Sequence, residues 1–339
     1  SAGFTIEERK QFQELLGKEY VDVWREKNPL SKDVKSGNIY TYFNNKFNAR
    51  ANGNGWRIDL ILMDKETYDQ NIIKNEASVQ AVIINLGIVN ACTGEQGMEY
   101  CEKTAKAAAL QLCVPEKSVL VASTGVIGMQ LPIEKIIAGV EKLSVHKADS
   151  IESGTLAAEA IMTTDTVSKQ IAVTFEIEGK TVTLGGMCKG SGMIHPNMCT
   201  MLGFLTTDLS ISKEMLQSAL SEDVIDTFNM ISVDGDTSTN DSLVIMANGV
   251  AGNTMITSKD SNYQIFKEAL KFVNTWLAKK MAGDGEGATA LFETKVVNAQ
   301  SKEQARVLAK AVICSSLTKA AIFGHDANWG RILCAMGYS

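Results

Sequence analysis

A glycine-rich run in the middle of the chain constrains its folding more than any other stretch. Residues 185–208 read GGMCKGSGMIHPNMCTMLGFLTTD and contain five glycines, one lysine and one proline. Glycine adopts backbone angles that other residues avoid and lets other groups approach closely, so the start of the run favours a binding loop over a helix. After Pro196 the run becomes apolar, which places Thr200 where an exposed loop enters buried structure. Its hydroxyl can be shielded from water there.

Thr200 is a candidate nucleophile. A threonine hydroxyl needs a base beside it, and the threonine's own α-amino group, freed by chain cleavage, is one such base. That amine titrates near pH ~8, so a useful fraction is neutral at working pH. Cleavage between Cys199 and Thr200 would therefore give the nucleophile its own base. The alternative is a glycine-rich turn that leads into a buried strand, with Thr200 as an ordinary strand residue.

Composition limits the classes of function. The chain has 339 residues, 45% of them apolar, which is enough for one large domain or two. A formal charge of −6 argues against non-specific binding to nucleic acid or to an anionic membrane. No apolar run approaches the ~20 residues of a membrane span, and the N-terminus has no signal-peptide pattern. These features predict a soluble cytoplasmic protein with no nucleic-acid or membrane partner.

The cysteines and histidines point to neither disulfides nor a metal. Seven scattered cysteines form no CxxC pair, which favours reduced, buried thiols. The three histidines lie far apart without ligand spacing, so we expect no metal site. His195 lies inside the glycine-rich run, where it either donates a hydrogen bond to a ligand or has a structural role.

Hydrophobic periodicity predicts the order of elements after residue 75. We expect a strand at 79–85, a strand within 118–132 that ends in a glycine turn, a hairpin that turns at Glu178-Gly179, and an acidic turn around Asp234 that leads into a strand. The helices are expected at 98–112, at 132–143 with Pro132 in first position, from 151, within 211–232, at 261–281 and, behind a capping box of Ser301 and Gln304, at 301–323. A glycine-rich loop and a further strand are expected within 282–297.

Residues 1–62 form a separate piece, with a helix expected from Thr5 and a turn-rich stretch that leads to a short strand. The runs AGFTIEER and FNARANGNGWRID resemble the C-terminal part of exonuclease-III-type AP endonucleases. That resemblance implies that Trp56, Arg57 and Asp59 correspond to residues around a DNA site. The family's other catalytic motifs have no counterpart here, so we expect this segment not to be catalytic.

From about residue 75 to Ser339 the sequence resembles the bifunctional ornithine acetyltransferases, which are glutamate N-acetyltransferases of arginine biosynthesis. KGSGMIHPNMCTMLGFLTTD is similar to their self-processing motif, with Cys199 where the family usually has alanine. The resemblance implies autocatalytic cleavage before Thr200 into an α-chain part, 75–199, and a β-chain part, 200–339. It also implies an α+β fold with mixed sheets covered by helices, in two interwoven lobes.

The same resemblance assigns the site residues. Thr124 and Gly125 would be the oxyanion-hole pair, at a strand end where backbone N–H groups can face a developing oxyanion; the alternative is an ordinary strand-to-helix turn. Thr163, Lys189 and Glu286 would contact substrate, with Lys189 holding a carboxylate and Glu286 an ammonium. The alternatives are an exposed loop lysine and a solvated loop carboxylate.

The implied reaction moves an acetyl group from N2-acetyl-L-ornithine to L-glutamate through an acetyl-threonine at Thr200. No cofactor is expected, although some members of the family also accept acetyl-CoA as donor, and the α and β chains would assemble into a heterotetramer. The family carries a further C-terminal region that has no counterpart here. The alternatives are a self-processing N-terminal-threonine aminopeptidase or amidase, and an inactive hybrid protein that never matures.

Overall fold

The computed structural model describes residues 79–144, 150–197, 200–238 and 240–339, together with four short strands earlier in the chain. Those strands are β1 (Tyr20–Asp22), β2 (Tyr42–Phe43), β3 (Gly55–Trp56) and β4 (Leu62–Asp64). β1 pairs with β4 and β2 pairs with β3, both antiparallel. The helix predicted from Thr5 lies outside the described residues. The chain divides into two compact units, residues 1–81 with 114–120, and residues 82–113 with 121–339.

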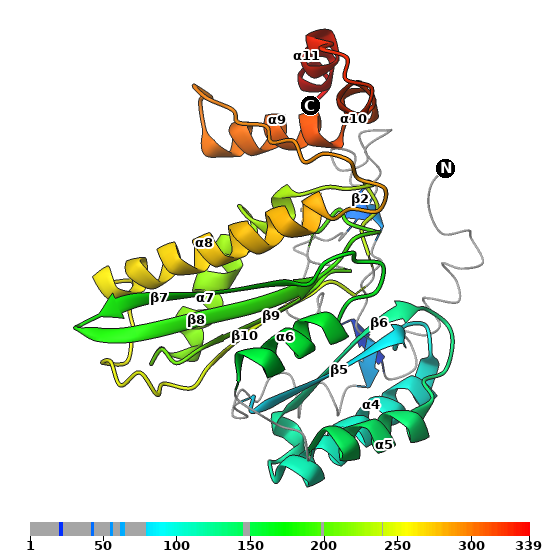
Figure 1. The fold of residues 1–339 in the computed structure, drawn as a ribbon, viewed down its shortest axis with the longest axis vertical. Coiled ribbons are helices and arrows are strands. Elements are labelled where there is room, and N and C mark those ends of the chain that lie inside the picture. The colour runs from blue at the N-terminus through cyan, green and yellow to red at the C-terminus, as the bar shows by residue number, and fades with distance from the viewer. Residues whose placement is uncertain are drawn as a thin grey trace. The chain divides into compact units, whose positions relative to one another are not determined.

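From residue 79 onward, helices and strands alternate in an α+β arrangement (Figure 1). The strands are β5 (Ala81–Ile88), β6 (Val119–Val126), β7 (Lys169–Ile177), β8 (Lys180–Lys189), β9 (Leu202–Thr207) and β10 (Ser242–Ala247). The helices are α4 (Gly94–Leu112), α5 (Ile133–Ser144), α6 (Ile151–Ala160), α7 (Lys213–Val224), α8 (Ser261–Gly283), α9 (Lys302–Cys314), α10 (Ser316–Phe323) and α11 (Trp329–Gly337), with 3-10 turns η4 (Glu116–Ser118) and η5 (Phe228–Met230). The predicted α+β class is confirmed.

A four-stranded sheet in the order β10-β9-β8-β7 forms the centre of the second unit. It is mixed, because β10 and β9 run parallel while the other neighbours are antiparallel. β7 and β8 are joined by the predicted hairpin, in which Glu178 (φ 52°) and Gly179 (φ 72°) both adopt the left-handed conformation that tight hairpins require. β8 continues to Lys189, so Gly185 and Gly186 are strand residues and the glycine-rich loop begins only at Gly190.

Helix α8 covers one face of this sheet (Figure 1). Its buried side chains recur at helical spacing, and Asp260 caps its first turn by accepting the N–H of Tyr263 at 3.0 Å. Gly186 explains how closely helix and sheet approach. A Cβ at that position would lie 3.2 Å from Leu277 Cδ1 and 3.3 Å from Leu205, so only a glycine leaves both leucines undisturbed.

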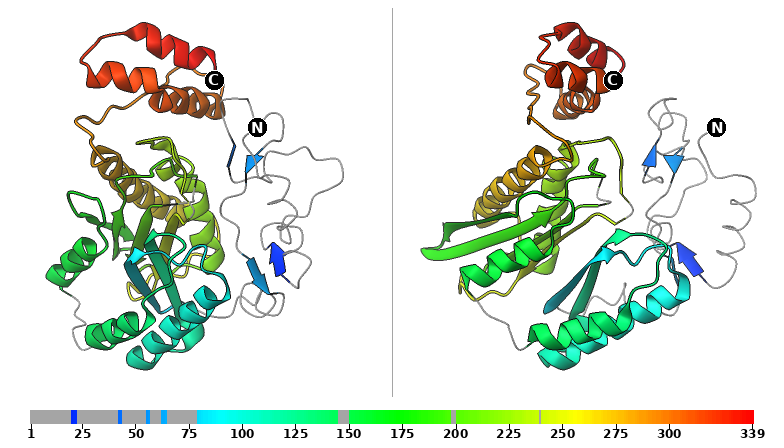
Figure 2. Two further views of the ribbon diagram at one scale, coloured as in Figure 1. Left: turned by 90° about the vertical axis from the view of Figure 1, so that its right-hand side faces the viewer. Right: turned by 45° about the vertical axis from the view of Figure 1, so that its right-hand side comes forward.

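The opposite face of the sheet packs against α6 and a two-stranded sheet of β5 and β6. Leu202 and Phe204 of β9 form a cluster with Ile161, and Val82 of β5 and Ala122 of β6 pack against it. α4 and α5 lie on the far side of β5 and β6 (Figure 2). β5 and β6 therefore lie on the face of the four-stranded sheet opposite α8.

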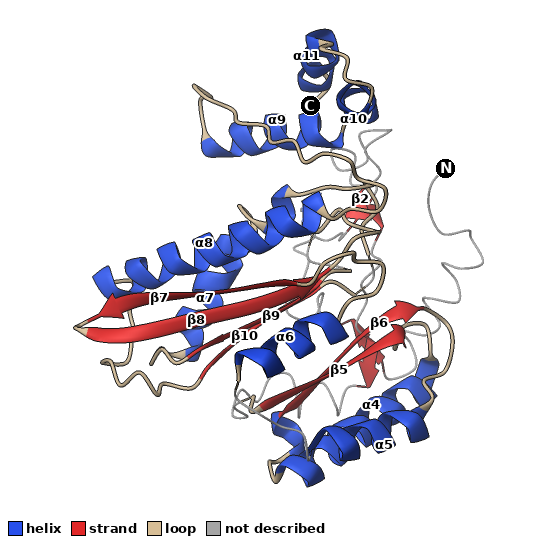
Figure 3. Cartoon of the chain, in the orientation of Figure 1, coloured by secondary structure: helices blue, strands red, loops and turns tan. Residues whose placement is uncertain are grey.

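The C-terminal part differs from the prediction in two places. The single helix expected at 301–323 is two helices, because Ser315 leaves the helical conformation and caps α10 by accepting the N–H of Thr318 at 3.2 Å. The strand expected within 282–297 does not form; Figure 3 shows the segment between α8 and α9 as loop. Its β-branched and aromatic residues favour a strand, but the segment pairs with none of the described strands, and a strand needs a partner. α9, α10 and α11 pack on one another.

Candidate active site

Thr200 lies directly before β9, the strand between β8 and β10. The N–H of Met201 donates to Asp241 Oδ1 at 2.5 Å, which fixes the backbone next to the threonine. The Thr200 hydroxyl oxygen is buried and has no hydrogen-bond partner among the described residues. Such a group costs free energy to bury, and its occurrence calls for an explanation such as a catalytic role. Cys199, on the other side of the expected cleavage point, lies outside the described residues.

Lys189 is the last residue of β8 and lies opposite Leu202 in the sheet, so it reaches the same edge as Thr200. Its residue is only 3% exposed, which makes the solvated loop lysine considered above wrong. Within the described part of the chain, no hydrogen bond or ion pair is found for its ammonium. Burial lowers the pKa of Lys189, and the Asp165 carboxylate offsets part of that effect. A desolvated cation of this kind suits an anionic ligand.

Thr124 and Gly125 lie near the end of β6, and Thr124 is buried at 3% exposure. The carbonyl of Ser123, one residue earlier, accepts the side-chain amide of Asn240 at 2.7 Å. Asn240 directly precedes Asp241, the residue that holds Met201. Two hydrogen bonds therefore connect the strand end at 123–125 with the start of β9. The role of this pair as an oxyanion hole stays a prediction.

Gly125 has a backbone that only glycine tolerates. Its φ is +137°, and a Cβ would lie 2.3 Å from the carbonyl carbon of Gly87 and 2.7 Å from the backbone nitrogen of Ile88. The ends of β5 and β6 can approach this closely only because the side chain is missing. The same approach is supported by the Asn90 N–H, which donates to Ser123 Oγ at 2.9 Å.

Thr163 is exposed in the turn after α6, and it connects to the glycine-rich loop through Asp165. The buried carboxylate of Asp165 accepts the N–H of Thr163 at 3.1 Å and the N–H of Gly190 at 2.7 Å. Burial alone would raise the pKa of Asp165, but the Gly190 N–H and the Lys169 ammonium outweigh it, so the pKa is lowered. Sequence reasoning missed Asp165; a lysine four residues after it was the only local signal.

Glu286 is exposed at the start of the loop after α8, yet it contacts the glycine-rich loop. Its N–H donates to the carbonyl of Ser191 at 3.1 Å. Its carboxylate lies against Gly192, where a Cβ would come within 2.5 Å of the Glu286 carboxyl carbon. The chain thus brings the backbone of Thr163, Lys189 and Glu286 together around residues 189–192.

The rest of the glycine-rich loop is held by the acidic turn and by α9 and α10. Asp234 accepts the N–H groups of Met193 at 2.7 Å and Ile194 at 3.0 Å, so the turn is hydrogen-bonded, but Asp234 is exposed and not buried as the resemblance implied. His195 Nδ1 lies 3.0 Å from Ser232 Oγ. Burial lowers the pKa of His195 to about 4, helped by Lys310 and Lys319. These contacts favour the structural role of His195.

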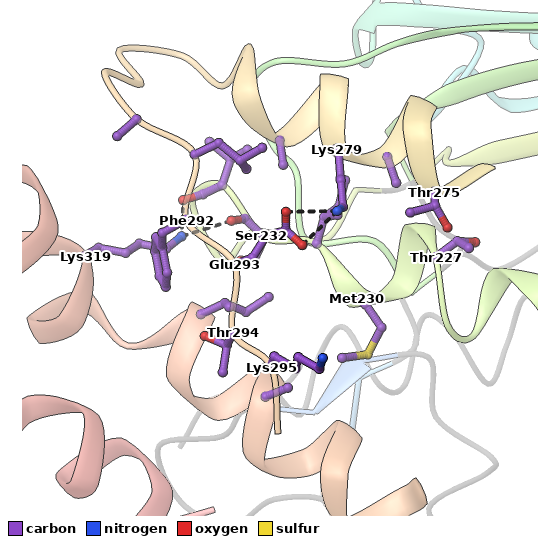
Figure 4. A pocket seen from close by; sticks show the side chains of 18 of the residues that line it. Thr227, Met230, Ser232, Thr275, Lys279, Phe292, Glu293, Thr294, Lys295 and Lys319 are labelled. Carbon is purple, nitrogen blue, oxygen red and sulfur yellow. Dashed lines mark hydrogen bonds and ion pairs between the residues drawn. The ribbon is translucent and has the colours of Figure 1, made fainter. Parts of the chain in front are cut away.

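A cavity of about 660 Å³ lies elsewhere, between α8, the segment 286–296 and the helices α9 and α10 (Figure 4). Lys279 and Glu293 form an ion pair across its wall at 2.7 Å. Glu286 lines it, but Thr200, Lys189 and Thr124 do not. We therefore place the candidate chemistry at Thr200, where the buried reactive groups gather, and not in this cavity.

Other expectations concern metals, thiols and membranes. In the described part of the chain, no group of three or more His, Cys, Asp or Glu side chains is arranged to hold a metal ion. The six described cysteines are all free thiols, but only Cys188 is buried, so the expectation of buried thiols is wrong for the others. None of the helices in the described ranges has the length and apolar character to span a membrane.

Comparison with known proteins gives consistent matches. A family model described as the ArgJ family matches residues 64–339, so its match begins before the expected start near residue 75. The chain is 53% identical over 264 residues to the arginine biosynthesis bifunctional protein ArgJ 1 of Clostridium acetobutylicum, covering 77% of this chain and 64% of that protein. It is 49% identical over 270 residues to the corresponding protein of Bacillus subtilis, covering 80% of this chain and 66% of that protein.

Two solved structures are also similar. One is the arginine biosynthesis bifunctional protein ArgJ of Bacillus halodurans, with 50% identity and a TM-score of 0.39, covering 40% of this chain and 63% of that chain. The other is an ornithine acetyltransferase of Mycobacterium tuberculosis in complex with ornithine, with 35% identity and a TM-score of 0.29, covering 34% of this chain and 61% of that chain. The chain thus spans about two thirds of the length of the relatives that it matches.

Proposed function

Because the chain belongs to the ArgJ family, we propose that it transfers an acetyl group from N2-acetyl-L-ornithine to L-glutamate through an acetyl-threonine at Thr200. The observation that carries the proposal is the buried Thr200 hydroxyl, which has no hydrogen-bond partner among the described residues. The buried ammonium of Lys189, at the same edge of the sheet, supplies the charge that a carboxylate-bearing substrate needs.

The proposed cycle begins after the chain is cut before Thr200. The freed α-amine takes the hydroxyl proton while the oxygen attacks the acetyl carbonyl, and the N–H groups at Thr124 and Gly125 stabilise the oxyanion. Collapse of the tetrahedral intermediate expels the ornithine amine, which receives the proton. The amine of glutamate then attacks the acetyl ester, and the released threonine oxygen is reprotonated. One nucleophile serves both half-reactions, so ping-pong kinetics are expected.

Lys189 and Glu286 provide the charges that orient the substrates in this proposal. Lys189 pairs with a substrate carboxylate from inside the protein, where the attraction is little screened. Glu286 faces the glycine-rich loop from the solvent side and pairs with a substrate ammonium. Lys189 is buried and Glu286 is exposed, so together they suit a ligand with a carboxylate and a separate ammonium.

Replacing Thr200 by alanine tests the proposal. The variant is expected to stay a single chain and to form no acetyl-glutamate, because it lacks both the cleavage nucleophile and the acyl acceptor. Mass measurement under denaturing conditions and an assay for acetyl-glutamate are the readouts. Thr206→Ala, an exposed position of the same strand, is the control and should leave both properties unchanged. Transfer retained by the Thr200→Ala variant would falsify the mechanism.

The same assay separates the transferase from a self-processing amidase. A hydrolase releases acetate and ornithine without glutamate, whereas the transferase needs glutamate for turnover. A wild-type chain that stays intact and forms no product supports the inactive alternative instead.

Further features belong to the same proposal. We expect the α-chain and β-chain parts to remain associated as a heterotetramer of interwoven lobes in the cytoplasm. The reaction as written needs no cofactor, and acetyl-CoA is an alternative donor. Residues 1–62 precede the region that the family model matches, and their likeness to AP endonucleases stays a prediction.

A further inference from the structure

Lys169, the first residue of β7, sits in a buried ionic network that the proposed chemistry does not use. Its side chain is fully buried, and its ammonium lies 2.6 Å from Asp165 Oδ1 and 2.6 Å from Asp284 Oδ2. It also donates to the carbonyl of Val167 at 3.1 Å. Both carboxylates are buried, with Asp284 8% exposed. Asp165, Lys169 and Asp284 are called the ionic triad below.

Both carboxylates of the ionic triad also accept hydrogen bonds from backbone N–H groups of nearby loops. Asp165 accepts the N–H groups of Thr163 and Gly190, as described above. Asp284 accepts the N–H of Thr166 at 3.0 Å, and its own carbonyl accepts the hydroxyl of Ser191 at 2.7 Å. The triad therefore joins the turn at 163–167, the loop at 190–192 and the loop at 284–286.

Those three loops carry the three expected substrate contacts. Thr163 lies in the first, Lys189 directly precedes the second and Glu286 ends the third. Among the described residues, none of the triad's hydrogen bonds or ion pairs is with Thr200, Thr124 or Gly125. Substrate-binding and bond-making groups are thus supported by different parts of the structure.

Both carboxylates of the triad are held in the charged form that accepts these hydrogen bonds. Burial by itself would raise the pKa of Asp284, but the hydrogen bonds from Lys169 and Thr166 lower it overall, as the contacts of Asp165 do for that residue. Two carboxylates and one ammonium leave one negative charge. Within the triad, the Asp165 carboxylate raises the pKa of Lys189 and so favours the charged form that binds a carboxylate, while the Lys169 ammonium lowers that pKa.

We infer that the ionic triad is a positioning unit that sets the distance and orientation between Lys189, Glu286 and Thr163, and so determines which amino-acid substrates fit. The inference rests on the proposed function for its substrate class, N-acetylated and free amino acids with a carboxylate and an ammonium. A triad that only stabilises the fold would have no effect on the site once the protein is folded. A positioning unit would change substrate binding in protein that is fully folded.

Lys169→Met and Asp284→Asn test the inference, with Lys180→Met as the matched control, because Lys180 is an exposed lysine of the neighbouring strand. In folded protein, both triad variants should raise KM for acetyl-ornithine and glutamate by about 10- to 100-fold, as expected when charged groups are misplaced by about 1 Å, with a smaller change in kcat. Lys169→Arg, which keeps the charge, should recover part of the loss. Self-cleavage before Thr200 should persist in all of them.

Amide hydrogen exchange gives a readout that does not need activity. The N–H groups of Gly190, which donates to Asp165, and Thr166, which donates to Asp284, should exchange faster in the triad variants and stay unchanged in Lys180→Met. Asp284→Asn covers the case in which Lys169→Met does not fold, because it keeps a hydrogen-bonding side chain in place.

Two results would overturn the inference. One is a wild-type KM in folded triad variants, and the other is unchanged exchange at Gly190 and Thr166. If the wild-type chain transfers no acetyl group, the proposed function fails, and exchange at those amides still decides whether the triad holds the loops.

Discussion

Replacing Lys189 by methionine removes a buried charge while keeping an unbranched side chain of similar length. The wild-type residue is only 3% exposed, and no hydrogen bond or ion pair of its ammonium is found among the described residues, so the folded protein bears the desolvation cost of the charge until a ligand binds. The variant should therefore be more stable and bind substrate less well. Two changes of opposite sign in one variant make a stringent test.

The size of each change follows from the burial. A hydrogen bond to a charged group contributes about 1.5–3 kcal/mol, which corresponds to a rise in KM of about 10- to 150-fold. Replacing buried charge by apolar groups of similar volume is often stabilising by about 1–4 kcal/mol, and we expect the gain for Lys189→Met to lie in that range. Initial-rate kinetics and urea unfolding measure the two quantities.

The stability difference should depend on pH. Burial lowers the pKa of Lys189 in the folded state, so between the folded and the unfolded pKa the unfolded chain binds more protons. Wild-type stability therefore rises with pH across that window. The advantage of Lys189→Met is full below the folded pKa and disappears above the unfolded one. A variant that is less stable than wild type at neutral pH and binds substrate with the wild-type KM would show that Lys189 is a structural residue.

Two further substitutions test the local structure around the site and at the C-terminal helices. Gly125→Ala should lower the free energy of unfolding by about 2–5 kcal/mol, because it adds left-handed strain and a Cβ only 2.3 Å from Gly87. Gly128→Ala is the control, because φ is also positive there (+77°) but no atom lies within 4 Å of the added Cβ. If both variants lose the same free energy of unfolding in urea, the close approach at Gly125 does not matter. Ser315→Ala should cost about 1 kcal/mol by removing the cap of α10, whereas the exposed Ser316→Ala should cost less; calorimetry that ranks them the other way would contradict the capping role.

Elements with a strong local signal were predicted well. The turn at Glu178-Gly179 was predictable because a glycine between two alternating runs favours a hairpin, and α8 because its apolar residues recur at helical spacing. The helix break at Ser315 was missed, since serine is tolerated inside helices and its capping hydrogen bond shows only in the fold. Residues 289–297 are rich in β-branched and aromatic residues, which favour a strand, but they pair with none of the described strands.

In the candidate site, too, the sequence indicated some residues, and only the fold showed how they are buried and bonded. The motif drew attention to Thr200, Lys189 and Thr124, but not to how deeply Lys189 is buried or to the absence of a partner for the Thr200 hydroxyl. Burial depends on what other segments cover a residue, and the covering segments here are remote in the chain. His195 shows the reverse case, where a residue inside the motif is held by Ser232 in a structural contact.

The sequence by itself determined the hairpin and the core helix α8, because these depend on spacing and residue type over short stretches. Its motifs indicated the family, and through the family the α+β class and the candidate nucleophile Thr200. Only the tertiary structure showed that Lys169 lies between one carboxylate four residues away and another 115 residues away, and that this contact joins the three loops that carry the proposed substrate contacts. Such contacts leave no periodic trace in the chain, since they arise when packing brings distant segments into a region that excludes water.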